Sequence, residues 1–200
     1  MASAVSHFII GATLALPLSG VPSIKKAVRP VGLMFTAGVL AVAPDLDTAF
    51  HGIIPYAHFL GHRGFVHSPF FAFLFAVILS LLLYAVARDL GFRAFFGITA
   101  AFTLALASHG ILDSMTDAGL GVMLLYPFSE ERIFLPWRPF YAPPIKLSSL
   151  SYGKVQIMLK SELPIVLGCV AVAGTVRLAL GLISSKKEPA NMKLQNMADD

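Results

Sequence analysis

Histidines and aspartates with the spacing of metal ligands recur along this chain. His109 and Asp113 are four residues apart, so on a helix they share one face and can hold the same ion. Two further pairs accompany them, Asp45 with Asp47 and His62 with His67. Mixed imidazole and carboxylate sets suit Zn²⁺ or Mn²⁺, and sites with bridging carboxylates often hold two ions. Such a site activates water and stabilises charge on a phosphoryl or acyl oxygen, so the pattern indicates hydrolysis.

The composition indicates that these residues belong to a membrane protein. Of the 200 residues, 56% are hydrophobic and only 13% are charged, and the mean hydropathy is +0.77. Soluble domains carry about 25% charged residues, and a water-soluble core could not hide so much apolar surface. The net charge of +4 does not indicate nucleic-acid binding, because the basic residues lie in short segments between apolar runs.

Five apolar segments are candidates for the membrane helices that position these pairs: residues 4–20, 31–46, 66–87, 94–112 and 163–183. A span needs about 20 mostly apolar residues. The first two are short and contain Gly and Pro, which leaves a tilted or re-entrant course open. We therefore predict an all-α polytopic membrane bundle of about five helices in one domain, residues 1–183. The polar tail, residues 184–200, is expected to be disordered and cytoplasmic.

The charged residues predict an orientation for this bundle. The basic residues next to the apolar segments fall on one side: Lys25, Lys26, Arg29, Arg88, Arg93, Arg177, Lys186 and Lys187. This side is expected to be cytoplasmic, which puts the N-terminus outside and the C-terminus inside. The opposite helix ends carry eight candidate metal ligands: His7, Asp45, Asp47, His62, His67, His109, Asp113 and Glu162. Because intramembrane ionisable groups are costly and face the bundle interior, we expect them to converge at the outer face.

The chain resembles the YdjM-type membrane-bound metal-dependent hydrolases over about residues 5–130. The motifs that carry the resemblance are His7 with Gly11, Pro44-Asp45-Leu46-Asp47, His62-Arg63-Gly64, His67-Ser68, Ser108 to Asp113, Thr116 with Gly119, and Pro127-Phe128-Ser129. This resemblance implies a helical membrane enzyme with a bound divalent metal in a bacterial inner membrane.

That family is distantly similar to zinc-dependent phospholipases C and single-strand-specific zinc nucleases. The similar part is the order Asp, His, then His-x-x-x-Asp, which corresponds here to Asp45 or Asp47, His67 or His62, and His109 with Asp113. The soluble enzymes carry further histidines beyond this element, whereas this sequence has none after His109. One or two ions are therefore expected in place of three. By the same resemblance, His7 and Glu162 serve as additional ligands.

We predict a metal-dependent hydrolase that acts on a phospholipid or a lipid-linked phosphate. Asp45 or Asp47 orients a metal-activated water, and Arg63 neutralises the phosphate. Ser68, Thr116 or Ser129 orient the ligands, and the apolar run from Leu120 to Phe128 admits a lipid chain.

Two alternatives stay open at this point, and so does the oligomeric state. One is a non-catalytic scaffold whose metal is structural. The other is an ion or metal transporter, which would need polar residues along the cytoplasmic half of the helices, where the sequence has few.

Overall fold

The chain is helical throughout the part that its structure describes. The computed structural model describes residues 2–50, 52–87, 90–142 and 151–196, with side chains as far as residue 183. Its α-helices are α1 (Ala4–Ala15), α2 (Pro22–Ala27), α3 (Pro30–Val42), α4 (Pro69–Val86), α5 (Phe92–Ser114) and α6 (Tyr152–Asn196). Three 3₁₀ turns join them: η1 (Leu18–Gly20), η2 (Ala43–Phe50) and η3 (Phe65–His67). The described residues form no β-strand, only two isolated bridges, so the predicted all-α class is confirmed.

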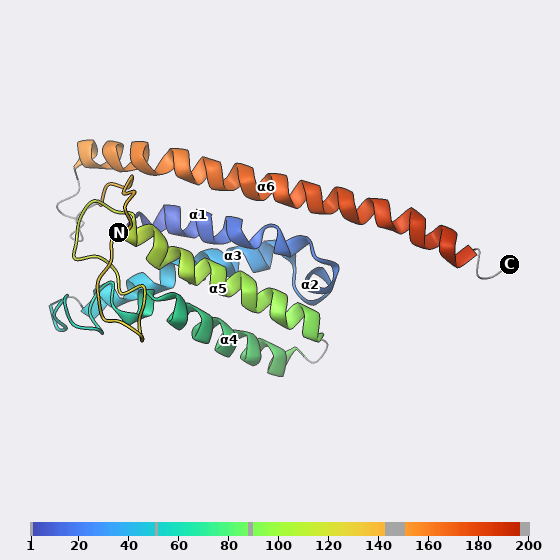
Figure 1. Cartoon of the computed structure of the whole chain (residues 1–200), viewed down its shortest axis with the longest axis horizontal. Coiled ribbons are helices and arrows are strands. Elements are labelled where there is room, and N and C mark those ends of the chain that lie inside the picture. The colour runs from blue at the N-terminus through green and yellow to red at the C-terminus, as the bar shows by residue number, and fades with distance from the viewer. Residues whose placement is uncertain (1, 51, 88–89, 143–150, 197–200) are drawn as a thin grey trace.

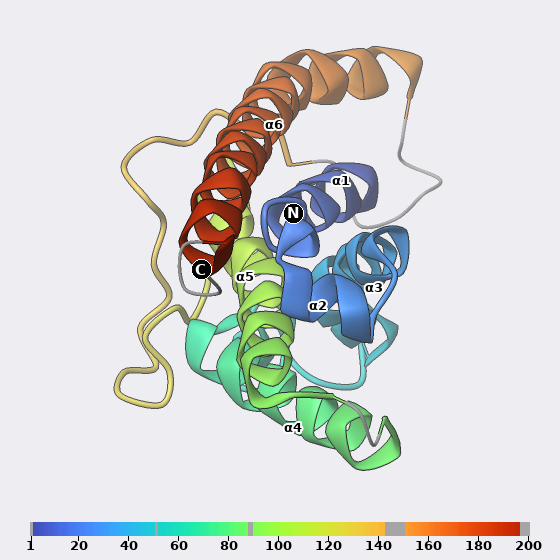
Figure 2. The same ribbon diagram turned by 90° about the vertical axis from the view of Figure 1, so that its right-hand side faces the viewer.

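Helix α5 lies at the centre of the bundle (Figure 1) and packs against α1, α2, α3 and α4. Helix α6 lies beside α1, on the side of the bundle away from α4 (Figure 2). Small residues on α3 and α5 fill the core, among them Ala37, Ala41, Ala101 and Ala105. Without a hydrophobic driving force between helices in lipid, such small residues favour association by allowing the backbones to approach closely.

Helices α1 and α3 pack closely against each other. A Cβ atom placed on Gly11 of α1 would overlap the Cβ of Ala41 and lie 2.9 Å from the carbonyl oxygen of Ala37. Glycine is therefore required at position 11 for the two backbones to approach this closely. The contact fixes the end of α3, which leads directly into the turn that carries Asp45 and Asp47.

Four segments are long and apolar enough to cross a membrane: Pro30–Phe50, Pro69–Val86, Phe92–Ser114 and Tyr152–Ile183. They correspond to the second, third, fourth and fifth apolar segments of the sequence. The first segment forms the shorter α1, whose 12 residues extend only about 18 Å. Because the hydrocarbon core of a bilayer is about 30 Å thick, α1 alone does not span it. The chain continues from α1 through η1 and α2 toward the opposite end of the bundle (Figure 1).

Helix α6 extends beyond the last apolar segment, as far as Asn196. Residues 197–200 lie outside the described part of the chain, and the division at residue 183 stays a prediction.

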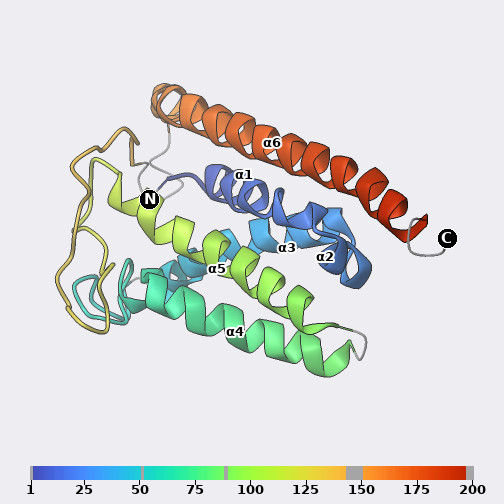
Figure 3. The ribbon, with the colours of Figure 1, turned by 45° about the vertical axis from the view of Figure 1, so that its right-hand side comes forward.

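Both long loops lie at one end of the bundle, which we call the site end. Residues 52–64 and 115–142 gather there beside the N-terminus (Figure 3). Lys25 and Lys26 lie on α2 at the opposite end. The predicted separation of the His and Asp residues from these basic residues is therefore present in the fold, and which end faces outward stays a prediction.

Candidate metal centre

Six of the predicted ligands form two overlapping groups at the site end. In each group, one ligand atom per residue lies within 4.8 Å of the others. The inner group comprises Asp45, His67, His109 and Asp113. The outer group comprises Asp45, Asp47, His62 and His67. Three elements distant in sequence supply them, namely η2, the segment that ends in η3, and the last turns of α5.

The inner group is buried from solvent. The Nε2 atom of His109 lies 3.3 Å from Asp45 Oδ1 and 3.9 Å from Asp113 Oδ2. The Nε2 atom of His67 also lies 3.9 Å from Asp113 Oδ2. The two imidazoles and the Asp113 carboxylate are fully buried, and Asp45 is only 8% exposed. Two nitrogens and two carboxylates therefore surround one small, dry volume, as in a four-coordinate metal site.

The backbone of α3 orients His109 for this arrangement. Its Nδ1–H donates a 2.7 Å hydrogen bond to the carbonyl oxygen of Ala41. The lone pair then resides on Nε2, the nitrogen that faces Asp45 and Asp113. Metal-ligating histidines are held in this way, with the second ring nitrogen donating to a carbonyl or carboxylate.

Helix α5 approaches η3 closely because residue 110 is glycine. A Cβ atom there would overlap the carbonyl oxygen of His67. His109 thus supplies one ligand, and the absence of a side chain at Gly110 lets the second ligand, His67, lie close to His109.

His67 joins the two groups. Its Nδ1 lies 3.5 Å from Asp47 Oδ2 in the outer group, while its Nε2 faces Asp113 in the inner group. Burial, reinforced by the neighbouring His109, lowers the pKa of His67 well below its ordinary value. The ring is therefore neutral at pH 7 and has a lone pair to offer a cation. In the outer group, His62 Nδ1 lies 2.7 Å from Asp47 Oδ1.

Arg63 is bound to protein groups, which differs from its predicted role toward phosphate. Its Nε donates to Asp113 Oδ2 at 3.1 Å, its Nη1 to the carbonyl of Ala118 at 2.9 Å, and its Nη2 to Thr116 Oγ1 at 3.0 Å. The side chain is 1% exposed, and its backbone has a φ of 61°. Arg63 therefore orients Asp113 and ties the loop before η3 to the loop after α5.

His7 lies next to the inner group but outside both sets of four. Its ring stacks on His109 with centroids 3.8 Å apart, and its Nε2 lies 3.4 Å from Asp113 Oδ1. The predicted ligand Glu162 is not brought to the cluster. Its carboxylate accepts hydrogen bonds from Ser3 N at 2.7 Å and Ser6 Oγ at 2.6 Å, so it attaches α6 to the start of α1.

Of the three hydroxyl groups predicted to orient ligands, one contacts the inner group and two have other roles. Thr116 accepts from Arg63 and donates to the carbonyl of Asp113 at 2.7 Å, so it supports the inner group. The hydroxyl of Ser68 caps α4 by accepting from Phe71 N, and that of Ser129 accepts from Glu131 N.

Sequence reasoning missed Arg132. Its two terminal nitrogens donate to the carbonyls of Tyr56, His58, His62, Arg63 and Gly121, at 2.7 to 3.4 Å. It therefore fixes the loop that carries His62 and Arg63. No spacing or motif signals this role, because its partners are backbone carbonyls and four of the five lie about 70 residues away.

The donor set fits a divalent cation. Among the described residues, several buried ligand atoms of the cluster have no hydrogen-bond partner: both ring nitrogens of His7 and His67, His109 Nε2, both oxygens of Asp45, and Asp47 Oδ2. A buried polar atom without a partner costs about 1–3 kcal/mol, so such atoms rarely gather at one place. A cation that accepts nitrogen and oxygen ligands would satisfy several of them together.

A bundle of apolar helices with a buried imidazole and carboxylate cluster at one end is a small polytopic membrane protein with a candidate metal centre. The chain belongs to the YdjM inner membrane protein family, whose sequence model matches residues 1–187. It is similar to the inner membrane protein YbcI of Escherichia coli (strain K12), with 37% identity over 153 residues, or 74% of this chain and 84% of that protein. No solved structure matches the chain. Membership of this family confirms the predicted inner-membrane localisation.

Two isosteric substitutions should separate a ligand from a structural carboxylate. Asp45→Asn removes a charge from both groups, so bound zinc should fall by about tenfold or more after loading and removal of excess metal. Glu162→Gln, at a position that is also buried, should leave the zinc content unchanged. Inductively coupled plasma mass spectrometry on the detergent-purified protein measures both. Equal metal content in wild type and Asp45→Asn would show that Asp45 is not a ligand.

Proposed function

We propose that this protein is a metal-dependent hydrolase that cleaves a phosphoester of a membrane lipid. The observation that carries the proposal is the buried cluster, in which ligand atoms of Asp45, His67 and His109 converge without hydrogen-bond partners of their own. Hydrogen-bonded structural networks satisfy their members, whereas catalytic metal sites present lone pairs to an ion. A cation held there would supply a Lewis acid and lower the pKa of a coordinated water.

The inner group is the proposed binding site for the ion. Asp45, His67 and His109 present lone pairs, and Asp113 adds a carboxylate whose position is fixed by Arg63. The guanidinium stays bound to Asp113 in this assignment, so the positive charge that faces the substrate phosphate would come from the bound cation. Asp113 also accepts from Ala2 N at 3.0 Å, which leaves few lone-pair directions on this carboxylate open to the ion.

The Asp47–His62 pair is the proposed proton acceptor. This pair lies at the outer side of the cluster, and the side chain of Asp47 is 8% exposed. The distance from His62 Nδ1 to Asp47 Oδ1 is 2.7 Å. A carboxylate paired with an imidazole can take a proton from an attacking water and pass it on. Asp47 is thus assigned to proton transfer and Asp45 to metal binding, roles that spacing alone could not divide.

An apolar groove next to Asp47 supports a lipid as the substrate. This lateral groove has a volume of about 260 Å³ and is lined by Ala43, Pro44, Leu46, Asp47, Phe50, Val66, Phe71, Phe75 and Leu106. Helices α3 and α4 both pack on α5 but hardly touch each other, so the groove lies between them. Because these helices are candidate membrane spans, a hydrocarbon chain can occupy the groove while the head group faces Asp47.

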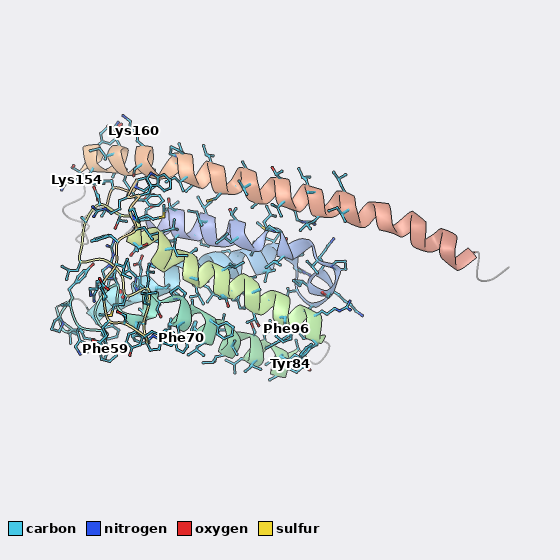
Figure 4. All side chains as sticks on the ribbon, viewed as in Figure 1. Phe59, Phe70, Tyr84, Phe96, Lys154 and Lys160 are labelled. Carbon is cyan, nitrogen blue, oxygen red and sulfur yellow. The ribbon has the colours of Figure 1, made fainter. Side chains whose placement is uncertain are left out.

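The run from Leu120 to Phe128, which was predicted to admit a lipid chain, does not line this groove. Val122 and Met123 are buried in the loop, whereas Phe128 is 87% exposed and its ring lies 6.2 Å from that of Phe70. Phe70 lies in the first turn of α4, at the site end (Figure 4). Exposed aromatic residues at this level are typical of a membrane interface, so this loop is better placed to hold the site at the bilayer surface.

The Asp47→Asn substitution should separate metal binding from turnover. The zinc-loaded variant should keep its inner ion but release head group or phosphate from mixed phospholipid vesicles about 10²-fold more slowly than wild type. Mass spectrometry of the lipid products, together with metal analysis of the same sample, checks both. A wild-type protein that binds zinc yet cleaves no membrane lipid would contradict the lipid hydrolase, and an Asp47→Asn variant of unchanged rate would contradict the assignment of Asp47.

The lateral groove leads to a second prediction, which concerns the length of the substrate. Ala43→Phe should fill it, so hydrolysis of a long-chain phospholipid should fall by about tenfold while a short soluble phosphodiester is cleaved at the wild-type rate. The control is Ala171→Phe, the same substitution at an exposed position on α6. Unchanged lipid hydrolysis in Ala43→Phe would show that the chain lies elsewhere, and equal losses on both substrates would show that the groove does not discriminate between them.

A further inference from the structure

A second pocket lies at the end of the bundle opposite the metal centre. It has a volume of about 640 Å³ and is bounded by η1, the start of α2 and the turns of α6 from Arg177 to Ile183. Its lining is mostly apolar and includes Gly20, Leu180 and Ile183, with two cationic side chains, Lys25 and Arg177. The proposed hydrolase does not use this pocket, so it calls for a separate explanation.

Arg177 lies within an apolar, membrane-spanning part of α6, Tyr152–Ile183. Its guanidinium packs against Gly20, where an added Cβ would overlap the Cζ and Nη1 atoms. Glycine at position 20 thus provides the space for a charged group between α6 and η1. Residues 177 and 183 are about 9 Å apart along the helix, so the charge lies near the end of the span.

No carboxylate neutralises Arg177 among the side chains that the structure describes. The described Asp and Glu residues all belong to the site end, namely Asp45, Asp47, Asp113, Asp117, Glu130, Glu131 and Glu162. None of the ion pairs or hydrogen bonds of the described residues includes Arg177 or Lys25. A cation in a membrane-spanning helix is costly without a counter-charge, so the pocket is suited to an anion.

We propose that this pocket binds the phosphate of an anionic phospholipid. The planar guanidinium can donate two parallel hydrogen bonds to a phosphate, and Lys25 adds a second positive charge at the rim. The apolar residues Leu180 and Ile183 lie where the glycerol and first acyl carbons would pass onto the lipid-facing side of α6. Basic pockets between membrane helices bind lipid head groups in this way. The site lies at the opposite end of the bundle from the metal centre and does not depend on the hydrolase proposal.

Native mass spectrometry of the full-length protein in detergent, with phosphatidylglycerol and phosphatidylcholine in equal amounts, tests this site. The wild type should retain phosphatidylglycerol about tenfold more than phosphatidylcholine. Arg177→Gln should lose this preference. Gly20→Ala should weaken it as well, because the added Cβ displaces the guanidinium while leaving the charge present. Lys26→Gln removes a charge from the same end but does not line the pocket, so it should behave as wild type.

Circular dichroism and the elution volume in size-exclusion chromatography provide the folding control for each variant, because neither depends on the metal centre. A wild type without preference for the anionic lipid would overturn the proposal. An unchanged preference in folded Arg177→Gln would overturn it too. Equal losses in Lys26→Gln and Arg177→Gln would show attraction to the net charge of this end, without a specific pocket. If inorganic phosphate removed the bound lipid at millimolar concentration, the site would be one for free anions and the lipid assignment would be wrong.

Discussion

The carboxylate of Asp113 connects three parts of the chain that are far apart in sequence. One oxygen accepts from Ala2 N ahead of α1, and the other accepts from Arg63 in the loop before η3, while the residue itself belongs to α5. Removing one partner of such a buried ion pair costs about 3–5 kcal/mol, because the remaining charge is left without compensation. The position of α1 at the site end, the course of the loop and the direction of the metal ligands all depend on this contact.

The different charges at the two ends of the bundle have one physical explanation. Ionisable groups in a lipid-surrounded protein must be paired, coordinated or placed near water. At the site end, Arg63, Arg132 and the backbone hold a cluster of imidazoles and carboxylates in one dry volume. At the opposite end, Arg177 and Lys25 border a pocket. Anionic ligands suit the basic end, and a cation suits the acidic one. The proposed lipid substrate reaches the cluster sideways, through the groove between α3 and α4.

The hydropathy pattern and the His and Asp spacing predicted much of this architecture. Helices α4 and α5 begin and end within about three residues of the predicted segments. His109 and Asp113, which are four residues apart, lie in the same group of candidate ligands. The functions of individual polar residues were harder to predict. Arg63 and Glu162 were expected at the substrate and the metal, yet their partners are Asp113 and the serines of α1. A sequence shows which groups are charged, whereas tertiary packing decides which of them neutralise one another.

X-ray absorption at the zinc edge, on purified protein loaded with zinc and freed of excess, tests the central claim most directly. The account predicts a shell of nitrogen and oxygen atoms at about 2.0–2.2 Å, with the outer-shell scattering of imidazole from His67 and His109. No retained zinc would contradict the account. So would a sulfur atom at about 2.3 Å, because Cys169, the one cysteine of the chain, lies on α6 outside the cluster.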